Sequence, residues 1–555
     1  MIRRRIAALL LVYSLMLPVF ALGQQPSTQS AQTADANDPI ARIKDEGLKR
    51  SQVMQTLEYL TDVIGPRLTA SPGMMRANEW TRDRLKSWGL EDARLEAWGP
   101  FGRGWTLKRF SAQITEPQSI PLIAYPKAWS PGTKGAITAE VVYLDAKDEA
   151  GLEKYRGKLK GAIVLMSAPR EIKASFEPLG ERMTEKDLLK LADAPDPATT
   201  PRRRPPLTPA QREAARLAAL KLQFVSAEGA AVLVDTSRGD GGTIFVQSAS
   251  VPQPFLESPF DPKRIQPWDK SAPKMPPQIV VSSEQYNRMV RMLGQGVPLK
   301  MNVDLQVEYQ DKDLMGYNTV AEIPGTDLKD EIVMVGAHMD SWHSGTGATD
   351  NGAGVAVAME AVRILKALNL QPRRTIRIAL WSGEEQGLLG SRAYVAQHFG
   401  QLGDGTRESA LAALLDGKTL PVMPKPDYEK FQAYFNLDNG TGRIRGVYLQ
   451  GNESVRPIFR SWLMPFRDMG AETLSISNTG GTDHQSFDAI GLPGFQFIKD
   501  EIEYDTRTHH SNQDVYDRIQ SDDMMQAATI MAAFLYNAAT MNERLPRKPV
   551  TVAKQ

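Results

Sequence analysis

The chain has 555 residues, 42% of them hydrophobic and 24% charged, as in a globular protein large enough for two or three domains. Its formal net charge is +1, so no overall field favours a nucleic acid or a membrane surface as partner. Cysteine is absent, which excludes disulfides, a catalytic thiol, cysteine-held zinc and a lipid anchor on cysteine. Any bound metal would need histidine, aspartate and glutamate ligands.

The N-terminus has the pattern of an export signal. A basic start, MIRRR, precedes an apolar run at 6–20, and small residues then predict cleavage after Gly23. The apolar run has about 15 residues, fewer than the ~20 that a membrane-spanning helix needs, although an uncleaved anchor is the alternative. We therefore expect a signal peptide at 1–23, a disordered polar tether at 24–37, and a secreted or periplasmic protein with no membrane contact after signal removal.

Apolar residues recur at helical spacing from 38 to about 105. The region 110–305 instead predicts a mostly β insert, with the residues at 183–212, rich in proline and arginine, as a mobile surface excursion. Its basic run at 202–204 fits a solvated linker better than a nucleic-acid patch. The β-type runs are at 120–125, 139–144, 161–166, 230–235, 243–248 and 278–282.

From 306 to 545 strands and helices alternate, and a tail follows at 546–555. Together with residues 38–109, this segment predicts an α/β domain whose central sheet is mainly parallel, with helices on both faces. No internal repeat is present. The expected strands are at 332–337, 374–381, 431–437 and 493–498, and the expected helices at 354–368 and 522–541.

All six histidines lie after residue 337, and several sit at the ends of expected strands. The carboxyl ends of strands in an open α/β sheet share one edge, where sites form. The polar residues at these ends should therefore converge, together with Asp350 in the glycine-rich loop 344–354. In chain order the strand ends carry His338 and Asp340, Glu384 and Glu385, Asp438, and the pair His509 and His510.

Imidazole nitrogens and carboxylate oxygens are suitable zinc ligands. Two histidines, two terminal carboxylates and one bridging carboxylate would supply a binuclear site, and three carboxylates with one hydroxide would balance two zinc ions. Taken alone, the pair Glu384 and Glu385 could be a solvated acidic turn. The loop 344–354 lacks the Gly-Lys-Ser/Thr of a phosphate cradle, and its Asp350 would repel phosphate. The H-E-x-x-H and G-x-S-x-G motifs are absent.

Six motifs resemble the co-catalytic zinc peptidases of clan MH, family 28, over about residues 315–540. The segment GPRLTASPG at 65–73 resembles the start of that family's fold, and GKLKGAIVLMSAP at 157–169 resembles its protease-associated insert. The run HMDSWHSGTGATDNGAG is most similar to a branch of secreted dipeptidases. The six motifs are HMD at 338–340, ATDNGAG at 348–354, WSGEEQGLLGS at 381–391, NLDNGTG at 436–442, GGTDHQSF at 480–487 and HHSNQD at 509–514.

The resemblance implies two Zn²⁺ ions and a role for each motif residue. Glu384 would be general base and acid, and Asp340 would orient the ring of His338. The family pattern puts the last ligand immediately before a small hydroxyl residue and four residues before an aspartate, which selects His510 over His509. The implied metal ligands are His338, Asp350 as the bridge, Glu385, Asp438 and His510.

The resemblance also implies an exported exopeptidase that hydrolyses dipeptides or short peptides through a metal-bridging hydroxide. The alternatives are a broad aminopeptidase of the same family, a glutaminyl cyclase and a non-catalytic, receptor-like binding module. Whether the chain forms a homodimer stays open. The expected partner is a small peptide substrate, and the candidate substrate-binding residues are Trp342, His343, Asp483 and His484, the last of which could instead only stabilise its loop.

Overall fold

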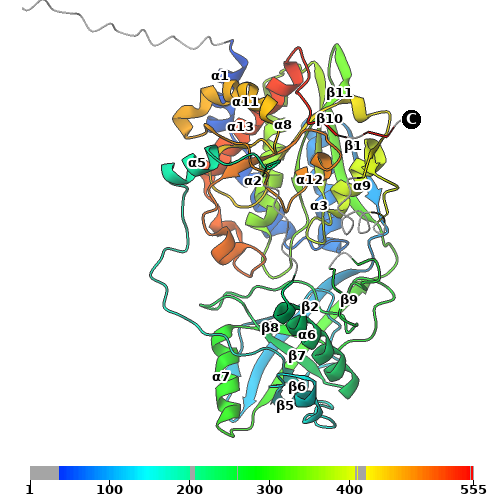
Figure 1. Cartoon of the computed structure of the whole chain (residues 1–555). Helices are drawn as coiled ribbons and strands as arrows, with labels where there is room; N and C mark the ends of the chain where they lie inside the picture. Colours follow the sequence, from blue (N-terminus) through cyan, green and yellow to red (C-terminus); the bar gives the residue numbers. More distant parts are fainter. Residues whose placement is uncertain are drawn as a thin grey trace, which may run out of the picture.

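The computed structural model of the protein describes residues 37–199, 207–258, 261–406, 409, 420–550 and 552–553. The expected signal peptide at 1–23 and residues 24–36 of the expected tether lie outside this part of the chain. Among the described residues, no helix combines the length and the apolar character needed to cross a membrane. The chain folds into two bodies, a main domain and an insert, each built around an eight-stranded sheet (Figure 1).

The sheet of the main domain has a parallel centre. Its four middle strands run parallel to one another, whereas β1, β10 and β16 pair antiparallel with neighbours. The predicted mainly parallel central sheet is confirmed, with antiparallel strands added towards its edges. In sheet order the strands are β1 (Glu91–Trp98), β10 (Gly316–Ile323), β12 (Arg374–Trp381), β11 (Leu328–His338), β15 (Phe431–Asn436), β18 (Gly494–Lys499), β16 (Ile444–Tyr448) and β17 (Thr473–Ser475).

Helices cover both faces of this sheet. Along β11, Val333 and Val335 point into one core, and Ile332 and Met334 point into the other, as expected for a strand buried on both sides. The first face carries α1 (Pro39–Lys49), α2 (Val53–Glu58), α3 (Pro72–Ser87), α8 (Ala353–Ala367), α11 (Arg456–Leu463) and α13 (Ser521–Thr540). The second carries α9 (Leu389–His398) and α12 (His484–Asp488), near a small hairpin of β13 (Gly400–Leu402) and β14 (Val422–Pro424).

The helical pattern expected from 38 to about 105 ends at Ser87. The helices α1, α2 and α3 confirm it up to that point, but it is wrong beyond, because β1 and the start of β2 (Gly104–Glu116) are strands. Gly89 has a φ of +82°, a left-handed conformation that ends a helix. In the edge strand β1, Ala93, Leu95 and Ala97 alternate with charged residues, but the burial of the strand does not follow this alternation.

The insert contains the second eight-stranded sheet, and five of the six predicted β-type runs overlap its strands. The run 243–248 is an exception, because it makes only isolated bridges. The strands β2 and β9 pair from Gly104 opposite Gln310 onwards, so the insert sheet extends past the expected limits at 110 and 305. In sheet order the strands are β3 (Ile120–Pro121), β2, β9 (Lys300–Gln310), β5 (Ile137–Tyr143), β6 (Ile163–Leu165), β7 (Val232–Thr236), β8 (Gln278–Val281) and β4 (Ala124–Pro126), with helices α4 (Glu149–Glu153), α6 (Pro209–Glu228) and α7 (Ser283–Gly294).

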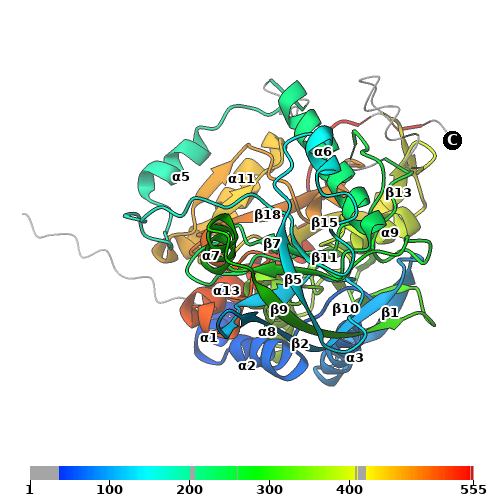
Figure 2. The same cartoon turned by 90° about the horizontal axis from the view of Figure 1, so that it is seen from below.

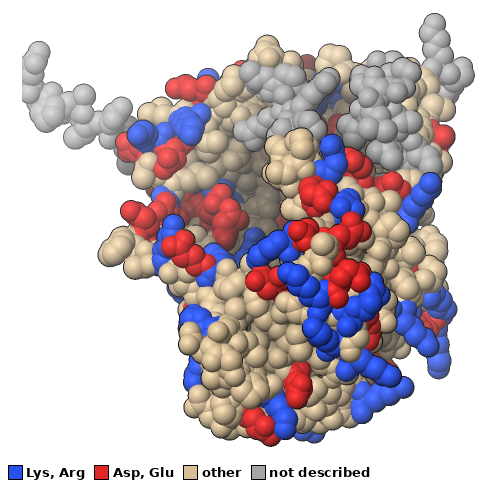
Figure 3. Space-filling view, turned by 60° about the horizontal axis from the view of Figure 1, so that its bottom comes forward, with Lys and Arg blue, Asp and Glu red and all other residues tan. Residues whose placement is uncertain are grey.

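Residues 179–192 of the insert lie against the main domain (Figures 1 and 2). Arg182 forms an ion pair with Asp500 at 3.0 Å, and α5 (Glu185–Ala192) packs against β17. The predicted excursion at 183–212 therefore has defined contacts over 183–199, while 200–206 lie outside the described residues. Figure 3 shows a face that is hollowed above the insert, with acidic and basic side chains intermixed around the hollow.

Candidate metal centre

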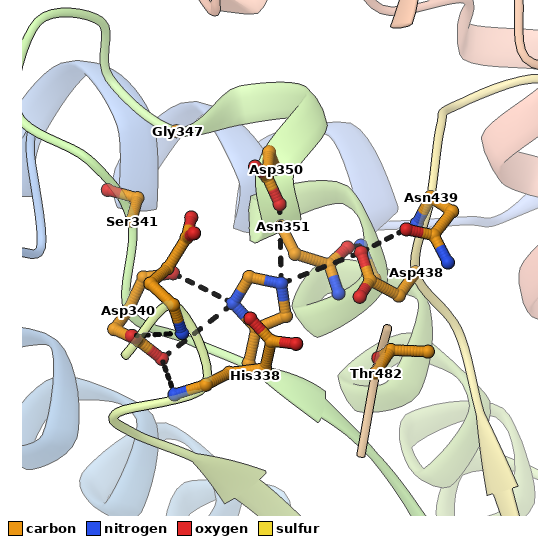
Figure 4. A network of polar contacts seen from close by, with 12 residues as sticks. His338, Asp340, Ser341, Gly347, Asp350, Asn351, Asp438, Asn439 and Thr482 are labelled. Carbon is orange, nitrogen blue, oxygen red and sulfur yellow. Dashed lines mark hydrogen bonds and ion pairs between the residues drawn. The ribbon is translucent and has the colours of Figure 1, made fainter. Parts of the chain in front are cut away.

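The first candidate residues lie where β11 ends. His338 is the last residue of this strand, and both His338 and Asp340 are buried. The Nδ1 atom of His338 lies 3.0 Å from the backbone oxygen of Asp340. A carbonyl oxygen can only accept, so Nδ1 carries the hydrogen and Nε2 is available as a ligand atom. This Nε2 lies 3.3 Å from Asp350 Oδ1 and 3.5 Å from Asp438 Oδ1 (Figure 4).

Asp350 lies at the centre of the group. It belongs to the turn Ala348–Gly352, immediately before α8. The carboxylate of Asp514 holds this turn by accepting the backbone N–H of Thr349 at 2.5 Å and of Asp350 at 3.3 Å. As a result, Oδ1 of Asp350 faces His338, while Oδ2 lies 3.1 Å from Nε2 of His510. One carboxylate thus lies between two imidazoles from distant parts of the chain.

Glu384 and Glu385 follow β12, and Asp340 contacts the backbone of both. The Asp340 carboxylate accepts both backbone N–H groups, at 3.2 Å and 3.3 Å, so it supports this turn, while the backbone carbonyl of Asp340 orients His338. Oε2 of Glu385 accepts the indole N–H of Trp342 at 2.7 Å and lies 2.9 Å from Nε2 of His510. Oε1 of Glu385 is buried and has no hydrogen-bond partner among the described residues.

The two adjacent histidines of the last motif differ in position. His510 points its Nε2 at Asp350 and Glu385, at 3.1 Å and 2.9 Å. His509 lies further away, with its Nε2 at 3.9 Å from Asp350, and its ring stacks on Tyr504. The structure therefore places Nε2 of His510 closer to Asp350 than Nε2 of His509.

The electrostatics are those of acids and imidazoles buried together. Burial raises the pKa of Glu384 well above its usual value and that of Glu385 to about 7, and neighbouring carboxylates add to both effects. Burial disfavours a charged His510, yet the carboxylates of Glu385 and Asp350 raise its pKa to about 10. Burial likewise opposes ionisation of Asp350, but His338 and His510 hold its pKa well below the usual range. These buried carboxylates therefore need bound protons or a cation to offset their negative charge.

The donor atoms fit divalent zinc. Ligand atoms of His338, Asp350 and Asp438 all lie within 4.8 Å of one another, and so do those of Asp350, His509 and His510. Both groups offer the nitrogen and oxygen donors that zinc accepts, and both contain Asp350. The free, buried oxygen of Glu385 adds an unsatisfied acceptor beside the second group. The residues present therefore fit two neighbouring cations that share Asp350.

The four candidate substrate-binding residues are all buried. Trp342 holds Glu385, and Nε2 of His343 lies 2.7 Å from the backbone oxygen of Pro126 in the insert, so His343 connects the two bodies. Nε2 of His484 lies 2.8 Å from Nε2 of Gln450 and 3.2 Å from the backbone oxygen of Thr479, a network that supports its loop.

Asp483 is fully buried, and neither of its carboxylate oxygens has a hydrogen-bond partner among the described residues. Burial raises its pKa to about 7, with the carboxylates of Asp438 and Asp340 contributing. The structure therefore places Asp483 among the acids of the centre.

Two residues of the N-terminal segment also belong to the centre and were not predicted from the sequence. The Thr69 hydroxyl donates to the Asp340 carboxylate at 2.9 Å. Arg67 is fully buried and donates to the backbone carbonyls of Met339, Thr346 and Gly347, each at 2.7 Å. The motif GPRLTASPG at 65–73 contains both residues, but only its resemblance to a known family, and no periodicity, marked it as special.

Comparisons with known proteins bear on this site. Residues 318–535 match Peptidase family M28. Carboxypeptidase Q of Mus musculus is 26% identical over 520 residues, which cover 93% of this chain and 92% of that protein. Carboxypeptidase Q of Homo sapiens is also 26% identical, over 93% of this chain and 91% of that protein. The crystal structure of a peptidase M28 precursor from Shewanella amazonensis has a TM-score of 0.61 at 23% identity, covering 92% of this chain and 98% of that one. A zinc aminopeptidase from Bacillus subtilis has a TM-score of 0.51 at 18% identity over 89% and 96%, and both structures show the same fold.

Proposed function

We propose that this chain, a peptidase with an M28 family domain at residues 318–535, is an exported exopeptidase that hydrolyses dipeptides or short peptides with two zinc ions. The observation that carries the proposal is the position of Asp350, whose two oxygens face His338 at 3.3 Å and His510 at 3.1 Å. A carboxylate between two sets of ligands suits a pair of metals that clamp one reacting centre. The similarity to carboxypeptidase Q over nearly the whole chain supports an exopeptidase.

Two zinc ions would polarise the peptide carbonyl and make a water molecule more acidic. Glu384 acts as general base and then as general acid, taking a proton from the attacking water and returning it to the departing amine. In the metal-free chain, burial and then the carboxylates of Asp438 and Asp483 raise the pKa of Glu384. Asp340 supports the turn that carries Glu384, and Trp342 holds Glu385 in place.

The position of the insert supports a short substrate. The backbone oxygen of Pro126 lies 2.7 Å from Nε2 of His343, and Phe245 forms a bridge with Ser511. The insert thus contacts the main domain on both the 342–344 loop and the 509–512 loop. An insert placed against both loops beside the centre is expected to favour the ends of peptides over internal segments. The N-terminal pattern at 1–23 supports export.

A broad aminopeptidase is the second candidate, since the aminopeptidase YwaD of Bacillus subtilis is 27% identical over 231 residues, or 40% of this chain. The two overlapping groups of ligand atoms favour two metals over the single zinc of a glutaminyl cyclase. A binding module without activity has no need of a buried base beside such groups.

The test combines metal analysis with a substrate panel. We expect about two zinc ions per chain and chelator-sensitive cleavage of dipeptides, with slower cleavage of amino-acid anilides. The variant Glu384→Gln should keep its zinc but lose roughly 10²- to 10⁴-fold in turnover, because it lacks the general base. Glu429→Gln, at an exposed position of the same domain, is the matched control. Loss of zinc in Glu384→Gln would show that this residue is a ligand, and anilides cleaved as fast as dipeptides would favour the aminopeptidase.

A further inference from the structure

The insert is joined to the loop that carries His510. Residues 244–246 run antiparallel to 510–512, with Phe245 opposite Ser511. The backbone N–H of Val246 donates to the carbonyl of His510 at 3.1 Å, and the backbone N–H of Asn512 donates to the carbonyl of Ile244 at 3.0 Å. The Asn512 side chain also accepts the Ile244 N–H at 2.7 Å. A short segment of the insert therefore fixes the backbone on both sides of Ser511.

The next residue of this segment contacts the His510 ring. The carboxamide nitrogen of Gln247 lies 2.9 Å from Nδ1 of His510. The other ring nitrogen, Nε2, faces the carboxylates of Asp350 and Glu385, which is the side where a cation would bind. Gln247 thus contacts the one polar atom of the His510 ring that points away from the candidate metal centre.

The hydrogen positions decide how these two groups interact. When Nε2 binds a metal through its lone pair, the hydrogen of the neutral ring is on Nδ1, which must then donate. A carboxamide nitrogen is also a donor and cannot accept that hydrogen. The two ends of a carboxamide exchange places by a half turn, so the oxygen of Gln247 can occupy the position facing Nδ1. A protonated His510 also carries a hydrogen on Nδ1 and requires the same orientation.

The corresponding nitrogen of His338 shows the same arrangement with a different partner. Its Nδ1 lies 3.0 Å from the backbone oxygen of Asp340, an acceptor from its own loop. At the same nitrogen His510 instead faces the carboxamide of Gln247 in the insert, 263 residues away in the chain. The two imidazoles of the centre are therefore oriented by different bodies of the protein.

We propose that Gln247 of the insert is a positioning residue for His510, accepting its Nδ1–H through the carboxamide oxygen and so strengthening one half of the metal centre. The inference rests on the proposed function, since it takes His510 as a metal ligand. It gives the insert a second role besides limiting the space for substrate. Partners of this kind around a metal-binding histidine are typically worth 10- to 100-fold in metal affinity.

The test measures metal binding directly, without peptide hydrolysis. The full chain is freed of metal with a chelator, dialysed and titrated with Co²⁺, whose visible absorption reports each binding step. We expect two equivalents in the unchanged protein. Gln247→Leu should weaken one of the two steps by 10- to 100-fold and leave the other unchanged. Gln247→Glu, which can only accept, should restore that step to within about threefold or tighten it.

The control is Gln113→Leu, at an exposed position on β2 of the same insert, which should bind both equivalents normally. Because Gln247 is exposed, the metal-free Leu variant should unfold at the same temperature as the unchanged chain. If Gln247→Leu binds both equivalents of Co²⁺ with normal affinity, the role of Gln247 is overturned and the proposed function is not. The same holds if Gln247→Glu fails to restore the weakened binding step. Absence of Co²⁺ binding by the unchanged chain would instead overturn the proposed function.

Discussion

Replacing Arg67 by methionine tests whether this buried cation holds the loops of the metal centre together. Its guanidinium donates to the backbone oxygens of Met339, Thr346 and Gly347, each at 2.7 Å, and to Gly65 at 3.1 Å. Burial lowers the pKa of Arg67 to about 10, so the side chain stays charged at neutral pH. Methionine has a similar length but no donor, and it would leave these carbonyls unpaired in the interior.

The loss in the free energy of unfolding depends on how many backbone carbonyls lose their donor. Each buried acceptor that loses its donor costs about 1–3 kcal/mol, so the three short bonds together represent roughly 3–9 kcal/mol. Removing a buried guanidinium from the interior offsets part of this, because the charge no longer has to be desolvated. We expect Arg67→Met to lower the free energy of unfolding by about 4 kcal/mol.

The assay is urea unfolding of the metal-free protein, followed by tryptophan fluorescence. For an m-value of roughly 3–4 kcal/mol/M, the midpoint should fall by roughly 1 M urea. The control is Arg76→Met, because Arg76 donates to one carbonyl only among the bonds described, that of Ile64 at 3.3 Å, and should shift the midpoint far less. An unchanged midpoint in Arg67→Met would refute the argument that these carbonyls depend on the guanidinium.

Two further predictions concern pH and packing. Burial lowers the pKa of His484 to about 4, so the unfolded chain binds its proton more readily, and the free energy of unfolding should fall as the pH drops from about 6.5 to about 4. Urea unfolding at several pH values should show a shallower fall in His484→Gln, and an identical slope would contradict this. Gly354→Ala would place its Cβ 2.3 Å from the backbone oxygen of Leu437, which should push α8 from the end of β15 and reduce zinc content. The control is Gly294→Ala, whose added Cβ has no neighbour within 4 Å, so this variant should keep its zinc. Equal zinc content in the two variants would mean that α8 can move to make room for the Cβ at position 354.

The core of the main domain could be predicted from the sequence because its elements are buried on both sides. The strand expected at 374–381 is β12, Arg374–Trp381, and the helix expected at 522–541 is α13, Ser521–Thr540. The candidate ligands converge as expected because they follow strands that end at one edge of a sheet. The edge strand β1 was missed because its short alternation of Ala93, Leu95 and Ala97 with charged residues follows directly on a helical pattern.

Contacts between distant segments could not be predicted in this way. Arg67 lies 272 residues from Met339, and Gln247 lies 263 residues from His510. Neither residue belongs to a local pattern of apolar or acidic residues that would single it out. The choice of His510 over His509 came from family resemblance. In the structure the two adjacent rings differ in their distance from Asp350, which is 3.1 Å for Nε2 of His510 and 3.9 Å for Nε2 of His509.

The pairing of β1 with β10 has a consequence for how the protein folds. Trp98 and Gly316 lie opposite each other, so the chain leaves the main sheet and returns to it at adjacent points, as in a hairpin with residues 99–315 as its loop. If that loop were unstructured, closing it would cost roughly 4 kcal/mol more than closing a two-residue turn. The ladder between β2 and β9 brings the ends of the loop together once the insert has folded. Early folding of the insert would therefore speed assembly of the main sheet, and a short turn between Trp98 and Gly316 could replace the insert without breaking that pairing.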